Sequence, residues 1–406
     1  MAFAIAALFL AACAADAAAP VSLGAGETPA SSEKRAGDVK DDGDADTAAP
    51  ANPEELAEAL PASGPGEWKW LDEQHFDGAP QCMDGSKTGL GVNRSPTGSK
   101  KVLVFMMGGG ACFDGQTCAI ADRALSANHA NAEDFATWST TDGKSAVMNR
   151  ERPENPFRDW NYVYVPYCSG DTFAGANPAG FKGRPQVGFK NVAAYLPRVV
   201  STFRDADQLV LTGMSAGGYG AAYNFVQVQK AFHWLDVTMI DDSGPPLSSD
   251  FTTPCLQQKW KQTWLMEETS PVEGPFPLGF DRTSGVAGPG LKALVKEVIA
   301  KHPKNKFAFV SHEHDLVMRY FHGIGHTRSC GAPGLLSAQF FADGLRDIRT
   351  IDSPNFSTFY GPGSGHTYFT KDDAMYGATA DGVALTEWLR QLVTTGDEAK
   401  RVPATF

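Results

Sequence analysis

Ser215 lies between two glycines in the stretch GMSAGGYG, which begins at Gly213 and directly follows the largely apolar run DQLVLT. A G-x-S-x-G pattern between a strand and a helix is typical of a serine nucleophile on a sharp turn. Side chains two positions from the serine would collide in such a turn, so glycines are needed there. The alternative is a tight turn that needs small residues, with the serine incidental. We predict that Ser215 is a nucleophile.

A serine hydroxyl is a poor nucleophile near neutral pH and needs a general base. His366 lies in GSGHTYF, after the final strand candidate, and no histidine follows it in the chain. Five other histidines fall around one earlier strand and helix: His302, His312, His314, His322 and His326. We therefore predict that His366 is the base.

A third group should orient the imidazole and stabilise it when it is protonated. Asp315 follows one strand candidate in SHEHD, whereas Asp241 and Asp242 follow the preceding one in MIDDSGPP. The pair at 241 and 242 can also be read as a turn or helix cap. The chain order Ser215, Asp315, His366 favours Asp315, and Asp242 stays the alternative acid.

The run HEHD also suggests metal ligands, because His312, His314 and Asp315 could bind a metal as an H-x-H-x-D fragment might. The glycine-rich turns and further His or Asp ligands of a metallohydrolase are not evident. We expect no catalytic metal and no cofactor.

Three glycines in MMGGGACFDGQTC follow an early strand candidate, at the place where one half of an oxyanion hole would lie. The backbone N–H groups of Gly109 and Gly110 are the predicted donors, and the amide of Ala216, after the nucleophile, is the third. Gly108 would bend the loop. A nucleotide-phosphate loop is the rival interpretation, but no Lys-Ser/Thr pair follows the glycines.

Apolar runs alternate with helical segments from about Trp68 onward, which predicts an α/β fold with one mostly parallel sheet flanked by helices. The region 251–290 is rich in Pro and Gly and lacks a clear strand, so we expect an excursion over the sheet that can cap a site. The strand candidates are 101–107, 162–167, 208–213, 235–240, 306–311 and 356–361, and the helix candidates are 221–232, 290–302 and 384–393.

The first residues, MAFAIAALFLAAC, resemble a lipoprotein signal peptide over 1–13, with Cys13 as the lipidated residue, although no Lys or Arg precedes it. Residues 14–65 are predicted to be a disordered acidic tether rich in Ala and Pro, and 66–406 the catalytic domain. Residues 1–65 carry eleven acidic and three basic residues, so they hold −8 of the net charge of −12. The body has no basic cluster, which argues against nucleic-acid binding.

The chain has seven cysteines, and setting Cys13 aside leaves an even number. In an exported chain this predicts disulfides, with 15 possible connectivities, and Cys112 with Cys118 could close a short loop. The absence of a C-x-x-C pair argues against zinc. The six are Cys82, Cys112, Cys118, Cys168, Cys255 and Cys330.

Four blocks together resemble the pectin acetylesterase and Notum family of α/β hydrolases: QCMDGSKTGLGVN, VFMMGGGACFDGQTC, NPFRDWNYVYVPYCSGDTFAG and GMSAGGYGAAYNF. The resemblance implies a disulfide-stabilised α/β-hydrolase fold and a secreted serine esterase with Ser215, Asp315 and His366 as its triad. It also implies the pairs Cys82–Cys168 and Cys112–Cys118, which leaves Cys255–Cys330. Ala111 stands where the family commonly has an aromatic residue.

We therefore expect a monomeric esterase outside the cytoplasm, secreted or held at the envelope only by a lipid at Cys13. Its expected substrate is an O-acyl ester, most simply an O-acetyl group on pectin or a related polysaccharide. Two alternatives stay open. One is a lipase or polyester hydrolase for longer acyl chains, and the other is a glycan-binding lipoprotein without catalysis.

Overall fold

The computed structural model describes residues 57–122, 130–272, 278, 280–281, 286–326, 330 and 334–394. All of them belong to one unit, Ala48–Phe406. The predicted signal peptide with Cys13, and the predicted tether up to residue 56, lie outside the described residues. Within the described part of the chain, no helix is long and apolar enough to cross a membrane.

Residues 57–65, which we assigned to the tether, pack against the folded domain. Leu60 is only 3% exposed, and its N–H donates to Thr202 Oγ1 at 2.7 Å. Pro65 forms an isolated parallel bridge with Arg94. The ordered domain therefore starts before residue 66.

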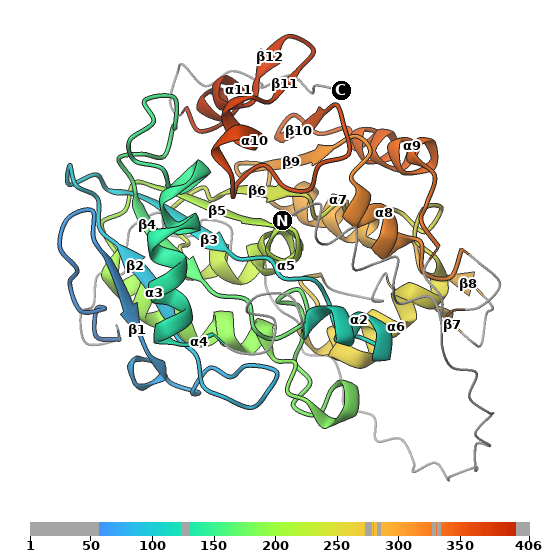
Figure 1. Ribbon diagram of the computed structural model, residues 1–406, viewed down its shortest axis with the longest axis horizontal. Coiled ribbons are helices and arrows are strands. Elements are labelled where there is room, and N and C mark those ends of the chain that lie inside the picture. Colours follow the sequence, from blue (N-terminus) through green and yellow to red (C-terminus); the bar gives the residue numbers. More distant parts are fainter. Residues whose placement is uncertain are drawn as a thin grey trace, which may run out of the picture. The chain divides into compact units, whose positions relative to one another are not determined.

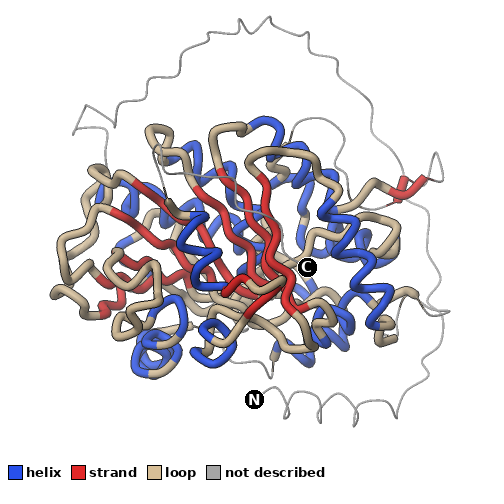
Figure 2. The backbone as a smooth tube through the Cα atoms, turned by 90° about the horizontal axis from the view of Figure 1, so that it is seen from above, coloured by secondary structure: helices blue, strands red, loops and turns tan. Residues whose placement is uncertain are grey.

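A mixed, mostly parallel sheet forms the centre of the described fold (Figures 1 and 2). Strand β2 pairs antiparallel with both of its neighbours, and the pairs from β4 through β10 are all parallel. Six of these strands were predicted, and β1 and β2 were not. In spatial order the strands are β1 (Trp68–Leu71), β2 (Leu90–Asn93), β4 (Asn161–Val165), β3 (Lys101–Met106), β5 (Gln208–Met214), β6 (Thr238–Asp242), β9 (Lys306–His312) and β10 (Phe356–Gly361).

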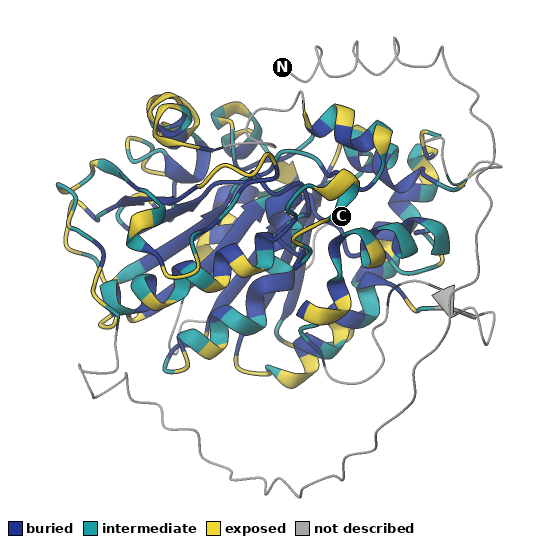
Figure 3. Cartoon of the chain, turned by 90° about the horizontal axis from the view of Figure 1, so that it is seen from below, coloured by how far each residue is buried: buried dark blue, intermediate teal, exposed yellow. Residues whose placement is uncertain are grey.

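Both faces of the sheet are buried, which explains why its parallel strands are almost continuously apolar. In β3, Val102 and Val104 face one apolar layer, whereas Leu103 and Phe105 face the other. The strands are accordingly dark blue between the helices in Figure 3. The first layer includes side chains of α4 (Gly188–Thr202), α5 (Ala216–Ala231), α7 (Leu291–Lys301) and α9 (Ala338–Arg349), and the second those of α3 (Ala132–Thr140), α10 (Asp372–Tyr376) and α11 (Leu385–Leu392).

The predicted excursion at 251–290 contains a helix and a small hairpin. Thr253 caps α6 (Pro254–Trp264) by accepting the N–H of Leu256, and Pro254 begins the helix. Our expectation of no strand here was wrong for β7 (Phe280–Asp281) and β8 (Val286–Ala287), which pair antiparallel. Each is two residues long, too short to leave an alternating pattern in the sequence. The remaining elements are α2 (Gly115–Ala121), α8 (Leu316–His322), β11 (Thr379–Ala380) and β12 (Val383–Ala384).

Candidate active site

The predicted catalytic residues lie in the segments that follow the carboxyl ends of the sheet strands. Ser215 follows β5, Asp315 follows β9, and His366 follows β10. The glycine loop at 108–110 follows β3, which is hydrogen-bonded to β5. Ligand sites of open α/β sheets are found outside this edge of the strands. The topology therefore brings these four segments to one region.

Ser215 occupies a strained turn between β5 and α5. Its backbone angles are φ 56° and ψ −119°, a left-handed conformation that is costly for a residue with a side chain. A Cβ at Gly217 would lie 2.0 Å from the carbonyl oxygen of Met106, and one at Gly213 would lie 2.2 Å from that of Gly217. Both positions of the motif therefore require glycine, as the sequence indicated.

The structure brings His366 and Asp315 into contact. His366 Nδ1 lies 2.8 Å from Asp315 Oδ2, and the imidazole is 19% exposed whereas the carboxylate is fully buried. Burial alone would lower the pKa of His366, but the charge and hydrogen bond of Asp315, with the charge of Asp242, raise it above its ordinary value. Among the hydrogen bonds of the described residues, none joins Ser215 Oγ to the imidazole, as is common before substrate binds.

Asp242, the alternative acid, contacts the histidine segment in a different way. Its Oδ2 accepts the backbone N–H groups of Tyr368 and Phe369, both at 2.8 Å. Asp241 Oδ1 instead accepts the N–H of Gly244 at 2.7 Å. The geometry thus favours Asp315 as the acid, because of the three carboxylates only Asp315 is hydrogen-bonded to the imidazole among the described residues.

The glycine loop approaches the nucleophile closely. A Cβ at Gly108 would lie 2.5 Å from the carbonyl oxygen of Met214 and 2.9 Å from Ser215 Cβ. Gly110 has φ +86°, and its carbonyl accepts the Tyr167 hydroxyl at 2.9 Å. Within the described part of the chain, no acceptor receives the N–H of Gly109, Gly110 or Ala216. These three amides are therefore available to an oxyanion.

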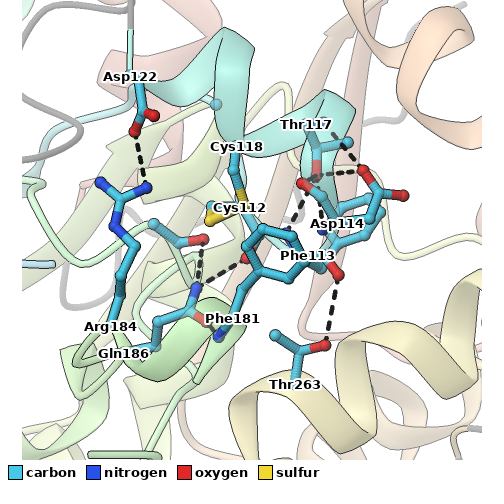
Figure 4. Close-up of a disulfide and its surroundings, with 12 residues drawn as sticks. Cys112, Phe113, Asp114, Thr117, Cys118, Asp122, Phe181, Arg184, Gln186 and Thr263 are labelled. Carbon is cyan, nitrogen blue, oxygen red and sulfur yellow. Dashed lines mark hydrogen bonds and ion pairs between the residues drawn. A yellow bond between two sulfur atoms is a disulfide. The ribbon is translucent and has the colours of Figure 1, made fainter. Parts of the chain in front are cut away.

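The Cys112–Cys118 disulfide braces the chain that follows this loop (Figure 4). The carbonyl of Cys112 accepts the side-chain N–H groups of Gln186 at 2.7 Å and Trp264 at 2.9 Å, while its N–H donates to Gly170 at 2.7 Å. Cys82–Cys168 and Cys255–Cys330 are also bonded. All three pairs are those that the family resemblance implied.

A largely apolar cavity opens beside Ser215, with about 760 Å³ of non-atom space including the open solvent at its mouth. Ser215 and Ala216 form part of its wall, and α6, α7 and α8 supply much of the rest. Sequence reasoning missed these walls, although Leu256, Trp260 and Trp264 recur at helical spacing in α6. The apolar side chains that line it include Trp260, Trp264, Leu294, Val295, Met318 and Phe321.

A buried histidine lies in this wall. His322 is 1% exposed, its Nε2 lies 2.8 Å from Tyr219 Oη, and its Nδ1 lies 3.1 Å from Thr252 Oγ1. Burial, aided by the charge of His326, lowers the pKa of His322 to about 3, so this ring stays neutral near pH 7. Both ring nitrogens have partners, and the cavity thus has no ionised side chain at this point.

The HEHD run does not gather ligands around one point. His312 Nδ1 lies 3.0 Å from Tyr368 Oη and 3.2 Å from the carbonyl oxygen of Pro362, and the side chain of His314 is 38% exposed. The described residues hold no group of three His, Cys, Asp or Glu side chains that could bind a metal ion.

Sequence relatives of the chain are carboxylesterases. Palmitoleoyl-protein carboxylesterase NOTUM of Drosophila melanogaster is 28% identical over 210 residues, which cover 46% of this chain and 31% of that protein. The human protein of the same name is 29% identical over 171 residues, 40% of this chain and 32% of that protein. In planarian NOTUM, from Schmidtea mediterranea, the match of 29% over 154 residues covers 37% of this chain and 28% of the relative. The chain thus aligns with about a third of the length of these relatives.

Solved structures share the fold. Two crystal forms of the Wnt deacylase Notum from Drosophila superpose with TM-scores of 0.51 and 0.53, at 17% and 18% identity, and the match covers 77% and 79% of this chain and 89% and 91% of those chains. The profile of the pectinacetylesterase family matches residues 66–270, which is half of the chain and includes the glycine loop and Ser215. The chain therefore belongs to the pectinacetylesterase family of carboxylic ester hydrolases.

Proposed function

We propose that this chain hydrolyses O-acyl esters through an acyl-enzyme, with Ser215 as nucleophile, His366 as general base and Asp315 as the acid that orients it. The observation that carries the proposal is the 2.8 Å contact of Asp315 with His366, at the sheet edge where Ser215 occupies its strained turn. Family membership supports the same reaction class.

In the proposed mechanism, His366 accepts the Ser215 proton as Oγ attacks the ester carbonyl carbon. Negative charge develops on the carbonyl oxygen, and the amides of Gly109, Gly110 and Ala216 stabilise it; one such donor typically contributes about 3–4 kcal/mol. The imidazolium then gives its proton to the departing alcohol, and the acyl group stays on Ser215. Water, deprotonated by the same imidazole, releases the acid and restores the serine.

The cavity favours an acyl chain longer than acetyl. Ligand pockets are typically lined mostly by apolar and aromatic side chains. The wall of this cavity, with Trp260, Leu294 and Phe321 among its residues, offers more apolar surface than the single methyl group of an acetyl ester can contact. Each buried methylene is worth about 0.8 kcal/mol, or about fourfold in kcat/KM if realised in the transition state. We therefore propose a medium or long hydrocarbon acyl chain as the substrate group, which was the alternative to O-acetyl pectin.

Three disulfides support a location outside the cytoplasm, because such bonds persist in oxidising compartments. We propose that the protein acts there as a monomer, held at the envelope by a lipid on Cys13. Loss of the lipid in Cys13→Ser, measured by acyl labelling and membrane fractionation, tests the anchor.

Three substrates test the reaction: p-nitrophenyl acetate, p-nitrophenyl octanoate and acetylated pectin, each with the wild type and Ser215→Ala. We expect Ser215-dependent turnover of both small esters, with higher kcat/KM for octanoate. A dominant preference for acetate and for pectin would restore the acetylesterase interpretation. Glycan binding without turnover, and without labelling of Ser215 by a serine-reactive phosphonate, would refute the enzyme proposal.

A further inference from the structure

Asp242 is the residue at which the nucleophile turn and the histidine segment meet. Its backbone carbonyl accepts the N–H of Ser215 at 2.7 Å. Its side chain accepts the N–H groups of Tyr368 and Phe369 through Oδ2, both at 2.8 Å. Oδ1 accepts the hydroxyl of Ser243 at 2.9 Å. The carboxylate is fully buried, so these groups replace its hydration.

The segment that carries His366 needs such an anchor. Between β10 and His366 the chain reads PGSG, in which the two glycines confer little rigidity of their own. Gly363 has φ +98°, and Thr367, directly after the histidine, has the left-handed value of +65°. A non-glycine residue keeps that conformation only where its surroundings impose it.

Anchors are present on both sides of His366. Before it, the N–H of His314 donates to the carbonyl of Gly363 at 3.0 Å, which ties the segment to the end of β9. After it, the two bonds to Asp242 tie positions 368 and 369 to the end of β6. Bonds to an ionised acceptor are roughly twice as strong as neutral ones.

We propose that Asp242 is a positioning residue for catalysis, which holds the His366 segment and the Ser215 turn in fixed relation through its side chain and its backbone. It is not the acid of the triad, because it acts on His366 through the backbone of the next residues. The inference rests on the proposed esterase function.

The charge of Asp242 also acts on His366. Burial raises the pKa of Asp242 to about 6. This rise is limited because the charge of His366 and three hydrogen bonds lower the pKa; the bonds come from Phe369, Tyr368 and Ser243. The carboxylate is therefore ionised near pH 7 and favours the protonated imidazole. Among the described residues, the other titratable groups acting on that ring are Asp315, which favours its protonation, and His312, whose own pKa is lowered by burial.

Asp242→Asn tests the role, because the amide keeps an acceptor for the two N–H groups but lacks the charge. We expect kcat to fall roughly 10-fold, within the up to about 100-fold that a small misplacement costs, with KM little changed. The acid limb of the rate profile should move to lower pH, because His366 loses a neighbouring negative charge.

Asp171→Asn is the matched control. Asp171 is equally buried and accepts two backbone N–H groups, of Phe173 at 3.0 Å and Gly188 at 2.7 Å, and the Ser169 hydroxyl. It has no hydrogen bond to the histidine segment among the described residues. Asp171→Asn should lose about as much stability in thermal unfolding as Asp242→Asn does. The acid limb of its pH–rate profile should stay where it lies in the wild type.

NMR titration of ¹⁵N-histidine-labelled protein, with His366 assigned by His366→Ala, gives a readout that does not need turnover. The His366 pKa should fall in Asp242→Asn and, by a smaller amount, in Ser243→Ala, which removes only the hydroxyl on Oδ1 and is the milder variant for folding. An unchanged His366 pKa, with kcat no lower than in Asp171→Asn, overturns the inference. Absence of Ser215-dependent turnover in the wild type would instead refute the esterase function, and the NMR comparison would still decide the role of Asp242.

Discussion

Asp315 divides its two carboxylate oxygens between helix α8 and His366. Oδ1 accepts the N–H groups of Val317 at 2.9 Å and Met318 at 3.0 Å, and Oδ2 lies 2.8 Å from His366 Nδ1. The helix therefore fixes the carboxylate, and the carboxylate in turn fixes the imidazole ring.

This relationship predicts unequal losses among the triad variants. Ser215→Ala and His366→Ala should each lower kcat by roughly 10⁴-fold or more, because each removes a group that takes part in bond changes. Asp315→Asn should cost less, since the acid orients and stabilises the base. Steady-state kinetics with p-nitrophenyl octanoate measure this, and a larger loss in Asp242→Asn than in Asp315→Asn would reverse our assignment of the acid.

The raised pKa of His366 predicts the pH dependence of turnover. The base acts only when neutral, so kcat/KM should fall as pH decreases through a value above the ordinary 6.5 or so of histidine. Asp315→Asn should move this limb to lower pH. A limb below the ordinary value in the wild type would contradict the observed pairing.

Stability should depend on pH through the same group. The pKa of His366 is higher in the folded state than its ordinary value, so protonation of His366 stabilises the fold. This contribution is fully present below the unfolded-state pKa and is lost as pH rises through the folded-state pKa. The wild type should therefore lose more free energy of unfolding than His366→Gln across that interval. Denaturant unfolding at several pH values measures the difference, and parallel curves would contradict it.

Filling the cavity should change acyl-chain preference. Ala222 lies on α5 and lines the cavity, so Ala222→Trp should lower kcat/KM for octanoate by more than tenfold, the scale of a few methylenes at about 0.8 kcal/mol each. Turnover of acetate should persist. Ala136→Trp, at an exposed position of α3 on the opposite layer, is the control; equal effects of both variants on octanoate would show that this cavity does not hold the acyl chain.

The two disulfides of the N-terminal half should separate stability from activity. Cys82–Cys168 spans 86 positions and Cys112–Cys118 spans 6, for which chain entropy gives about 4.6 and about 2.2 kcal/mol. The double alanine variant of the first pair should therefore unfold more easily. The double alanine variant of Cys112–Cys118 should lose more activity, because Cys112 adjoins the glycine loop. Thermal unfolding and ester kinetics on both variants check whether the variant that loses more stability is the one that loses less activity.

The parallel strands of the sheet were predictable because burial on both faces makes each a continuous apolar run. The two strands with antiparallel partners, β1 and β2, were not. In β1 three of the four residues of WKWL are only partly buried, and in β2 a glycine occupies the place where Phe135 packs. A Cβ at Gly91 would lie 2.4 Å from the Phe135 ring. β1 has two tryptophans and the alternation W-K-W but is only four residues long, and β2 contains a glycine and an asparagine, which are depleted in strands.

The site was predictable as far as chain order determines it. The turn at Ser215 and the position of His366 follow from motif and order, whereas Asp242 and Asp315 both follow strands that end at the same edge. Only the packing of the loop after β10 shows that Asp315 contacts the His366 ring, whereas Asp242 contacts the backbone N–H groups that follow it. The cavity depends on contacts between α6, α7 and α8, which are distant in sequence and have no motif.

Helix α8 combines two tasks within seven residues. Asp315 caps its first turn, and Met318 and Phe321 form cavity wall. Substitutions that adapt the cavity to a new substrate should therefore not be tolerated equally on every helix that lines it. We expect replacements on α8 that reshape the cavity also to disturb the Asp315 carboxylate, and those at Trp260 on α6 or Leu294 on α7 to leave it in place. Diversification of acyl preference within this lineage should accumulate on α6 and α7, with α8 evolving slowly.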